Sequence, residues 1–533
     1  MALVIEVLVL AGLGLLLAVA LTFGARAAAA RASKITYRVV ALTLASASVL
    51  ALLSVTGHVG WGNNDPQPRP APVDAALNVF VTGSVCARNF LGVWQCDGAS
   101  ALHALRATDG SIRWRSAPAN HPDIMLGAPL LANGVIYTYT SSATYSSDGA
   151  RQNQQLVAAR ASDGTVLWHT TVPGLLDFNT QPAIFGGILY NFGYSNGSTN
   201  NSPTSVLSAV RATDGALLWH NSYPFNVYTF EVLGDTLYVI SSENSTPQPT
   251  TQQTIWQSVA LNISDGTMLR KTALLTTTLP APVYPYATNQ YVLHGDTLYT
   301  CEQDGNALAT RIADGKPLWR YAPPTSSSDT TNTCTLTVTD DTVYVSSQPS
   351  DGLVALRAAD GKLLWRFPKA SVSIEGMRNG VVYVEVPGSA CSNYPALAGN
   401  PPTDTLYALD TATGAIHWQR TLPCYTIQNF GPNRQNTNLI TDDALYLGGR
   451  NTLYVFQASD GARLWQQAQA NYVLTPEAEA QGVVFIQGIY SASGLSLGTA
   501  RFNTITALRA SDGAFYWQTR LLANGASTSV TAG

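Results

Sequence analysis

The stretch ALRATDGSIRW, residues 104–114, recurs along the chain with small changes. It returns as AARASDGTVLW ending at Trp168, AVRATDGALLW ending at Trp219 and ALRAADGKLLW ending at Trp365. Each copy consists of two short runs of alternating character on either side of an Asp-Gly pair. Such a pair predicts a tight β-hairpin, because the turn requires positive φ angles that glycine adopts without strain.

This hairpin motif occurs nine times, at steps of 46 to 54 residues between its glycines. In the second unit, residues 128–142 also predict two strands ahead of the hairpin. A period near fifty residues with four short strands is typical of the blades of a β-propeller. The motif glycines are Gly110, Gly164, Gly215, Gly266, Gly315, Gly361, Gly414, Gly461 and Gly513.

A tryptophan occupies the same position on the last strand of eight units, and only Arg270 in the fourth unit breaks the series. We expect each indole ring to lie between adjacent blades, with its N–H donated to a backbone carbonyl. The fourth unit is therefore expected to be the most irregular. The eight residues are Trp114, Trp168, Trp219, Trp319, Trp365, Trp418, Trp465 and Trp517.

Units such as ALDTATGAIHW, residues 408–418, resemble the tryptophan-docking motif of the pyrroloquinoline-quinone (PQQ)-type β-propeller repeat family. That family includes quinoprotein dehydrogenases and the propeller lipoprotein of the outer-membrane assembly machinery. The resemblance covers about residues 76–520 and implies a propeller, usually of eight blades, without implying an enzyme. We therefore expect an all-β fold over residues 76–533, a single large β-propeller of eight to nine four-stranded blades.

The first sixty residues have a different character. Residues 2–23 are 22 residues with one charge, and residues 39–55 form a second apolar stretch. Each is long enough to suggest a membrane-spanning helix. We expect transmembrane helices at 1–24 and 39–56, and a linker rich in proline, glycine and asparagine at 57–75.

The loop between the two apolar stretches, residues 25–38, contains four basic residues and no acidic one. By the positive-inside rule this loop is cytoplasmic, which puts the propeller on the extracytoplasmic side of the cell membrane. The alternative is a cleaved signal peptide, but the start MALVI lacks the basic residues of such a peptide. Charged residues are only 12% of the chain and the net charge is −4, without a basic block, so a nucleic-acid partner is not expected.

The units also serve as an internal alignment of their turns. In six units the turn aspartate follows an arginine by three residues, and arginine appears only opposite aspartate. We expect an ion pair across the turn rather than a ring of cations for a ligand. The pairs are Arg106–Asp109, Arg160–Asp163, Arg211–Asp214, Arg311–Asp314, Arg357–Asp360 and Arg509–Asp512.

No catalytic or metal-binding residue is assigned. The chain has no adjacent cysteines, no CxxCH segment, no Gly-x-Ser-x-Gly and no HExxH, and its seven histidines show no ligand spacing. No cofactor is predicted from the residues. PQQ with calcium is implied only by the resemblance to the dehydrogenases of the family.

The long connections gather on one face of the predicted ring, opposite the minimal turns. Residues 141–154, 193–205, 388–404 and 422–435 are examples. Function concentrates on elaborated loops that a rigid scaffold holds, and tyrosines suit interfaces. The candidate partner-binding residues are Tyr145, Tyr194, Tyr394 and Tyr425. The alternative is that these loops are merely tolerated insertions.

The six cysteines suggest three disulfides on this loop-bearing face. Cys86 and Cys96 bracket one loop, while Cys301 with Cys334, and Cys391 with Cys424, repeat a spacing of 33 residues. In each of these two pairs the first cysteine lies at or after the second strand of a unit, and the other in the following connection. The extracytoplasmic side would allow these bonds to form.

The end of the chain is expected to complete the first blade. Residues 526–533, ASTSVTAG, are favoured as this closing strand over 521–525, because the latter segment begins only four residues after Trp517.

These observations favour a membrane-anchored extracytoplasmic binding or scaffolding module for a protein or glycan partner in the cell envelope. The alternative is a PQQ-dependent or sugar-oxidising dehydrogenase that uses the propeller funnel. A sensor that relays occupancy through the two spans is a third reading, disfavoured by a cytoplasmic loop without an output domain.

Overall fold

The computed structural model describes residues 68–532 with gaps in its connections. The gaps are 89–93, 97–100, 117–123, 142–153, 177–181, 195–204, 245–250, 281–290, 302–305, 324–332, 349–351, 370, 389–402, 424–437, 491–501 and 523–530.

The expected helices at 1–24 and 39–56, and the loop at 25–38, lie outside the described residues, as does most of the linker. Among the residues that are described, no helix has the length and apolar character needed to cross a bilayer.

The chain divides into two compact units. The first comprises Met1–Gln67 with Cys86–Asp97, and the second comprises Pro68–Val85 with Gly98–Gly533. The described residues of the first unit, 86–88 and 94–96, lie on β2 (Val85–Arg88) and β3 (Trp94–Cys96), which pair as a small antiparallel hairpin. The second unit holds the repeats.

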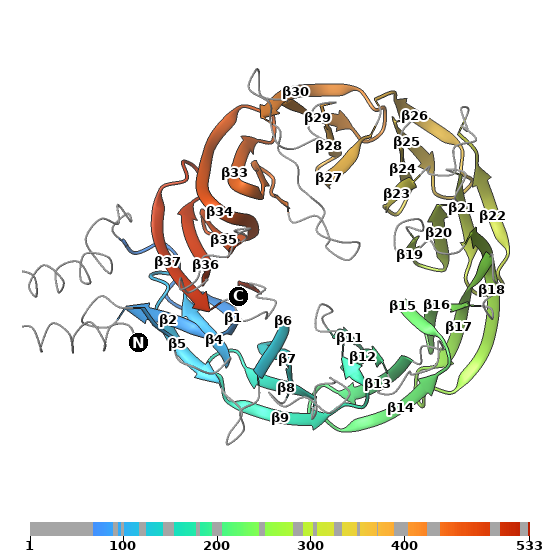
Figure 1. Cartoon of the computed structure of the whole chain (residues 1–533), viewed down its shortest axis with the longest axis horizontal. Helices are drawn as coiled ribbons and strands as arrows, with labels where there is room; N and C mark the ends of the chain where they lie inside the picture. Colours follow the sequence, from blue (N-terminus) through green and yellow to red (C-terminus); the bar gives the residue numbers. More distant parts are fainter. Residues whose placement is uncertain are drawn as a thin grey trace, which may run out of the picture. The chain divides into compact units, whose positions relative to one another are not determined.

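The described strands of the second unit form blades that follow one another around a common axis (Figure 1). Blade 1 is β38 (Thr531–Ala532), β1 (Asn78–Gly83), β4 (Ala101–Arg106) and β5 (Ile112–Ser116). Blade 2 is β6 (Ile124–Ala132), β7 (Val135–Ser141), β8 (Gln155–Arg160) and β9 (Val166–Thr171). Blade 3 is β10 (Leu175–Leu176) and β11 (Ala183–Phe185), both paired with β12 (Ile188–Tyr194), then β13 (Ser205–Arg211) and β14 (Leu217–Tyr223).

Blades 4 to 7 are four-stranded sheets. Blade 4 is β15 (Asn226–Leu233), β16 (Thr236–Asn244), β17 (Thr251–Asn262) and β18 (Met268–Pro280). Blade 5 is β19 (Tyr291–His294), β20 (Thr297–Cys301), β21 (Ala307–Arg311) and β22 (Pro317–Tyr321). Blade 6 is β23 (Thr333–Val338), β24 (Thr342–Gln348), β25 (Gly352–Arg357) and β26 (Leu363–Phe367). Blade 7 is β27 (Ser373–Arg378), β28 (Val381–Val386), β29 (Thr403–Asp410) and β30 (Ile416–Pro423).

The last two blades share one strand, β34 (Arg463–Ala480), which has 18 residues. Residues between Arg463 and Leu474 pair with β33 (Gly449–Gln457) as the outer strand of blade 8, and residues between Tyr472 and Ala480 pair with β35 (Val483–Tyr490) as the inner strand of blade 9. Blade 8 begins with β31 (Leu439–Ile440) and β32 (Ala444–Leu447), and blade 9 ends with β36 (Phe502–Arg509) and β37 (Phe515–Leu522). The described part of the chain therefore contains nine blades.

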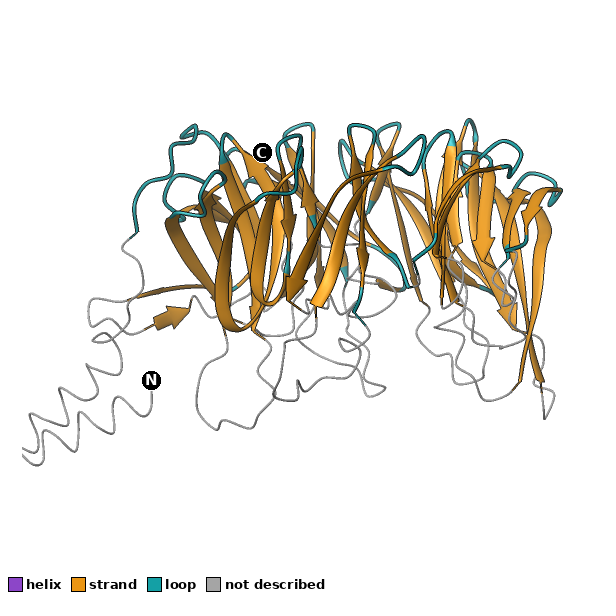
Figure 2. Cartoon of the chain, turned by 90° about the horizontal axis from the view of Figure 1, so that it is seen from above, coloured by secondary structure: helices purple, strands orange, loops and turns teal. Residues whose placement is uncertain are grey.

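All nine motif hairpins are present, and a β-bulge lies beside the tryptophan position in each. In blade 1, for example, Ala104 lies opposite Trp114, and the register shifts between Ala104 and Leu105. The bulge increases the local twist of the outer strand next to the tryptophan. The short turns within the blades lie together on one face of the ring (Figure 2).

The prediction that the end of the chain completes the first blade is confirmed for Thr531 and Ala532. These residues pair with Phe80 and Val79 of β1. The fourth unit, which the sequence singles out as the one to deviate, has all four strands, with register shifts between β15 and β16 and between β17 and β18. Other irregular places are the divided inner strand of blade 3 and the shared strand of blades 8 and 9.

Candidate functional site

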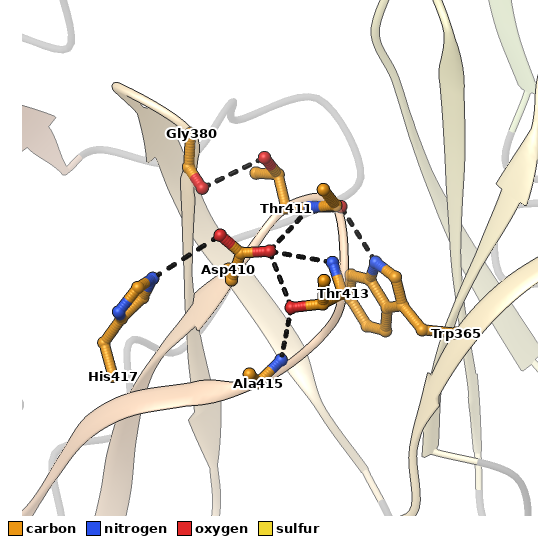
Figure 3. Close-up of polar contacts among 8 residues, drawn as sticks. Trp365, Gly380, Asp410, Thr411, Thr413, Ala415 and His417 are labelled. Carbon is orange, nitrogen blue, oxygen red and sulfur yellow. Dashed lines mark hydrogen bonds and ion pairs between the residues drawn. The ribbon is translucent and has the colours of Figure 1, made fainter.

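Each tryptophan of the repeat joins its own blade to the next one. Figure 3 shows one example, in which the indole N–H of Trp365 donates to the carbonyl oxygen of Thr411 at 2.8 Å. The other seven pairs, at 2.7–3.0 Å, are Trp114 with Ala161, Trp168 with Ala212, Trp219 with Ile263, Trp319 with Ala358, Trp418 with Ala458, Trp465 with Ala510 and Trp517 with Ala107.

The same indole rings lie against the turn glycine of the following blade. A Cβ atom on Gly164 would lie 2.4 Å from the ring of Trp114, and one on Gly414 would lie 2.6 Å from the ring of Trp365. These glycines also have positive φ angles, +72° at Gly164 and +70° at Gly414. Glycine is therefore required at these turns for two reasons, the backbone conformation and the contact with the indole.

The turn aspartates hold the hairpins closed mainly through the backbone. Asp163 accepts a hydrogen bond from the backbone N–H of Thr165 at 2.9 Å, and Asp214 accepts one from Ala216 at 3.1 Å. These backbone bonds are the largest cause of the lowered pKa of both carboxyls. In blade 7, Thr413 occupies the position of the turn aspartate, and the aspartate is Asp410, three residues before it. It accepts from the hydroxyl and the N–H of Thr413 at 2.7 and 2.8 Å (Figure 3).

The predicted arginine–aspartate pairs form in five of the six units, with N–O distances of 2.8–3.3 Å. In the first unit Arg106 instead donates to the hydroxyl of Ser111 at 2.9 Å, and that hydroxyl donates to Asp109 at 2.6 Å. These arginines therefore serve the exposed turns, as the sequence predicts.

Blade 4 replaces its missing tryptophan with groups from β17 and from another part of β18. The hydroxyl of Ser258 on β17 donates to the carbonyl oxygen of Ile312 at 2.5 Å, the acceptor that an indole binds in other blades. The ring of Trp256 is buried and lies 5.4 Å from that of Tyr291 in blade 5. Thr272 and the carbonyl oxygen of Ala273 occupy the space over Gly315. Arg270 itself is exposed.

Of the four candidate partner-binding tyrosines, Tyr145, Tyr394 and Tyr425 lie outside the described residues. Tyr194 is the last residue of β12, at the end of the strand opposite its short turn, where its backbone pairs with Leu175 and Ser205. The partner-binding role of each of these tyrosines stays a prediction.

The Cys301–Cys334 disulfide is present, with a Cα–Cα distance of 5.8 Å. Cys301 ends β20 as predicted, but Cys334 lies within β23 and not in the connection before it. The bond therefore links blade 5 directly to blade 6. Cys86 takes part in a disulfide, and the strand register places it opposite Cys96. Cys391 and Cys424 lie outside the described residues.

Three buried carboxyls, which the sequence analysis did not identify, lie on the side of blade 7 that faces blade 8. They are called the carboxyl cluster of blade 7 below. The cluster consists of Glu375 on β27, Glu385 on β28 and Asp404 on β29, which are 3%, 8% and 0% exposed. Glu385 lies opposite Leu406, and Asp404 lies two residues from Leu406, so their side chains share one face of the sheet.

Hydrogen bonds connect this carboxyl cluster to blade 8. The side-chain amide of Asn438, just before β31, donates to Glu375 at 2.5 Å and accepts from the backbone N–H of Gly448 at 3.2 Å. Ser373 also donates to Glu375, at 2.7 Å, and the N–H of Gly388 donates to Asp404 at 3.0 Å.

The carboxyl cluster of blade 7 holds a proton at neutral pH. Burial, followed by the charges of Glu375 and Asp404, raises the pKa of Glu385 to about 10. Burial also raises the pKa of Glu375. Because Glu385 and Asp404 share a hydrogen bond, one of these two carboxyls must be the donor and therefore protonated.

The alternation of one strand contains a signal for one member of this cluster, Glu385. Strand β28 reads VVYVEV, and Glu385 occupies a position whose side chain faces the next blade. At the equivalent position, β16 has the buried residue Ile240 and β20 has Cys301. A carboxyl in that position indicates a buried polar contact between blades.

The family model described as "Outer membrane protein assembly factor BamB" matches the chain over residues 45–223, 154–350, 325–482 and 450–533. No match is found among curated proteins. Similar solved structures include BamB from Moraxella catarrhalis, 14% identical, covering 75% of this chain and 97% of that chain with a TM-score of 0.40. Another is the quinohemoprotein alcohol dehydrogenase from Comamonas testosteroni, 13% identical, covering 86% of this chain and 78% of that chain with a TM-score of 0.38.

Proposed function

Because the chain belongs to the family of the outer membrane protein assembly factor BamB, we propose that it is a scaffolding module that binds a protein partner in the cell envelope. The family match, which runs through the repeats from residue 45 to residue 533, is the observation that carries this proposal. The eight indole contacts between blades support it, because a rigid ring presents its connecting loops with little loss of conformational entropy on binding.

We further propose that residues 1–24 and 39–56 anchor the ring to the membrane, with residues 25–38 in the cytoplasm. The apolar lengths and the basic loop support this topology. A reporter fused after Ser529 should be active only outside the cytoplasm. Activity of that fusion in the cytoplasm would contradict the anchored topology while leaving the binding function untouched.

The PQQ and calcium of the dehydrogenases do not fit the described residues well. Calcium requires ionised oxygen ligands, whereas burial raises the pKa of Glu375 and Glu385 in blade 7 and so favours their protonated forms. Within the described ranges, no group of three or more histidine, cysteine or acidic side chains is arranged to hold a metal ion. We derive no reaction through this cofactor.

Site-specific photocrosslinking in the full chain tests the binding function. A photoreactive residue at Tyr194, or at Tyr145, Tyr394 or Tyr425, should give a discrete protein adduct in intact envelopes. The same residue at Asn133 or Asp235, which are exposed on the short turns, should not. Equal labelling from both faces would exclude a protein site on the loop-bearing face. Adducts to glycan alone would replace the protein partner by a glycan.

A further inference from the structure

The outer strand of blade 4 differs from the other outer strands in length. Strand β18 has 13 residues, whereas the unshared outer strands of the other blades have 5 to 8. It lies at the end of its sheet, with β17 on its inner side. The outward backbone groups of β18 therefore have no neighbouring strand in the described part of the chain.

The exposed side chains at the start of β18 combine apolar and basic groups. Met268 and Leu269 are 53% and 58% exposed, the highest values among the exposed large hydrophobic residues described. Arg270 and Lys271 follow them, and both are exposed.

Arg270 does not contribute to the interface between blades 4 and 5. The contacts that a tryptophan makes in other blades are supplied here by Ser258, Trp256, Thr272 and Ala273. The position that elsewhere holds a docked indole therefore presents a guanidinium to solvent.

We propose that the outer edge of β18 is a docking surface for an extended acidic segment of a partner protein, which adds to blade 4 as a further strand. The open backbone edge supplies hydrogen bonds, Met268 and Leu269 supply apolar contact, and Arg270 and Lys271 attract carboxylates. A second copy of this chain is a poor occupant, because antiparallel pairing of two β18 edges brings like charges together. This surface lies on the outer wall of the ring and does not depend on the loop-bearing face.

Peptide binding to the full chain in detergent tests this proposal. The probe is a short fluorescent peptide in which glutamate alternates with valine. We expect saturable binding, and we expect the double variant Arg270→Glu with Lys271→Glu to weaken it by about tenfold or more. Arg366→Glu, which changes an exposed outer-strand cation of blade 6, is the matched control and should leave binding unchanged.

Two modified peptides separate strand addition from charge attraction. N-methylation of alternate backbone amides removes donors but keeps the side chains, so binding should be lost. Replacing glutamate by lysine should also abolish binding. Hydrogen exchange should slow in β18 when the unmodified peptide is bound.

Several outcomes would overturn the proposal. Equal binding of the N-methylated peptide would mean that no strand is added. Unchanged binding to the double variant would place the peptide elsewhere. A third outcome is that the peptide does not bind, that vesicles of anionic phospholipid bind the wild type, and that the double variant no longer binds these vesicles. The surface would then contact a membrane. If Arg270→Ala with Lys271→Ala instead produces dimers, the cations only prevent self-association.

Discussion

Trp517 in the last blade donates its indole N–H to the carbonyl oxygen of Ala107 in the first blade, at 2.9 Å. Trp517 is 1% exposed, and its ring lies against the turn glycine of blade 1, Gly110. The indole contact that joins all other neighbouring pairs of blades except blades 4 and 5 thus also joins the two ends of the repeat. Trp517 and Ala107 are 410 residues apart in sequence. This indole therefore closes the ring by joining the last blade to the first.

Trp517→Ala should lower the free energy of unfolding by about 3–5 kcal/mol, because it leaves a cavity and removes the indole hydrogen bond. Trp517→Phe keeps much of the ring and should lose less. Chemical denaturation followed by circular dichroism measures both. If the two variants were equally stable, packing of the ring would not be the main contribution.

Arg270→Trp should destabilise the chain although it restores the residue found in the other eight units. Thr272 and Ala273 already occupy the space over Gly315, and Ser258 already binds the carbonyl oxygen of Ile312. Overpacking of this kind costs about 1–3 kcal/mol. The measurement is the denaturation midpoint, with Arg270→Ala as the control; a rise in the midpoint would show that the space is free.

Gly414→Ala should be more harmful than Gly380→Ala. Both glycines have positive φ angles, +70° and +75°, so the backbone strain is similar. Only Gly414 also contacts an indole, since a Cβ there would lie 2.6 Å from the ring of Trp365, whereas at Gly380 the nearest atom is 3.8 Å away. The difference in free energy of unfolding therefore measures the indole contact, and equal losses would contradict it.

The free energy of unfolding should fall as the pH rises above about 5, because of the carboxyl cluster of blade 7. The pKa of Glu385 is about 10 in the folded chain against an ordinary value of 4.5, so the folded state binds the proton more tightly. This contribution is complete below pH 4.5 and is lost progressively as the pH approaches 10. Glu385→Gln mimics the protonated form.

We expect the wild type to lose about 2–4 kcal/mol relative to Glu385→Gln between pH 5 and pH 8. Melting temperatures across this range provide the measurement. Asp442→Asn is a useful control, because Asp442 pairs with Arg378 at 2.6 Å at the other end of the same interface, and its pKa is lowered by that hydrogen bond. Parallel pH profiles for wild type and Glu385→Gln would contradict the buried proton.

Replacing Cys301 and Cys334 by serine should lower the free energy of unfolding by about 2–4 kcal/mol, because the bond closes a loop across 33 residues. The effect should disappear when wild type and variant are compared under reducing conditions. Mass spectrometry of unreduced peptides checks the other two predicted pairs, Cys86–Cys96 and Cys391–Cys424, in the same experiment.

The repeat could be predicted from sequence because its elements are local. The turn glycine and the tryptophan, such as Gly414 and Trp418, lie within one hairpin, and repetition makes the pattern visible. The replacement of an indole by Ser258 and Trp256 could not be predicted in this way. It depends on side chains from a different strand that meet the next blade only after folding.

The carboxyl cluster of blade 7 could not be predicted as a whole, for a similar reason. Glu375, Glu385 and Asp404 come from three strands, and only the register of the sheet puts them on one face. The position of Cys334 within β23 was missed because strand ends are set by pairing with β24, which the sequence does not specify. Element boundaries and contacts between blades thus depend on tertiary structure.

Strand β38 has a consequence for the order of events during synthesis. Blade 1 draws β1, β4 and β5 from the beginning of the repeat region but receives its inner strand from Thr531 and Ala532. A chain still growing on the ribosome therefore exposes the unpaired edge of β1 until Thr531 and Ala532 have been made. An unpaired strand edge is a template for pairing with another chain, so this edge is open to misassembly while the eight following blades are synthesised.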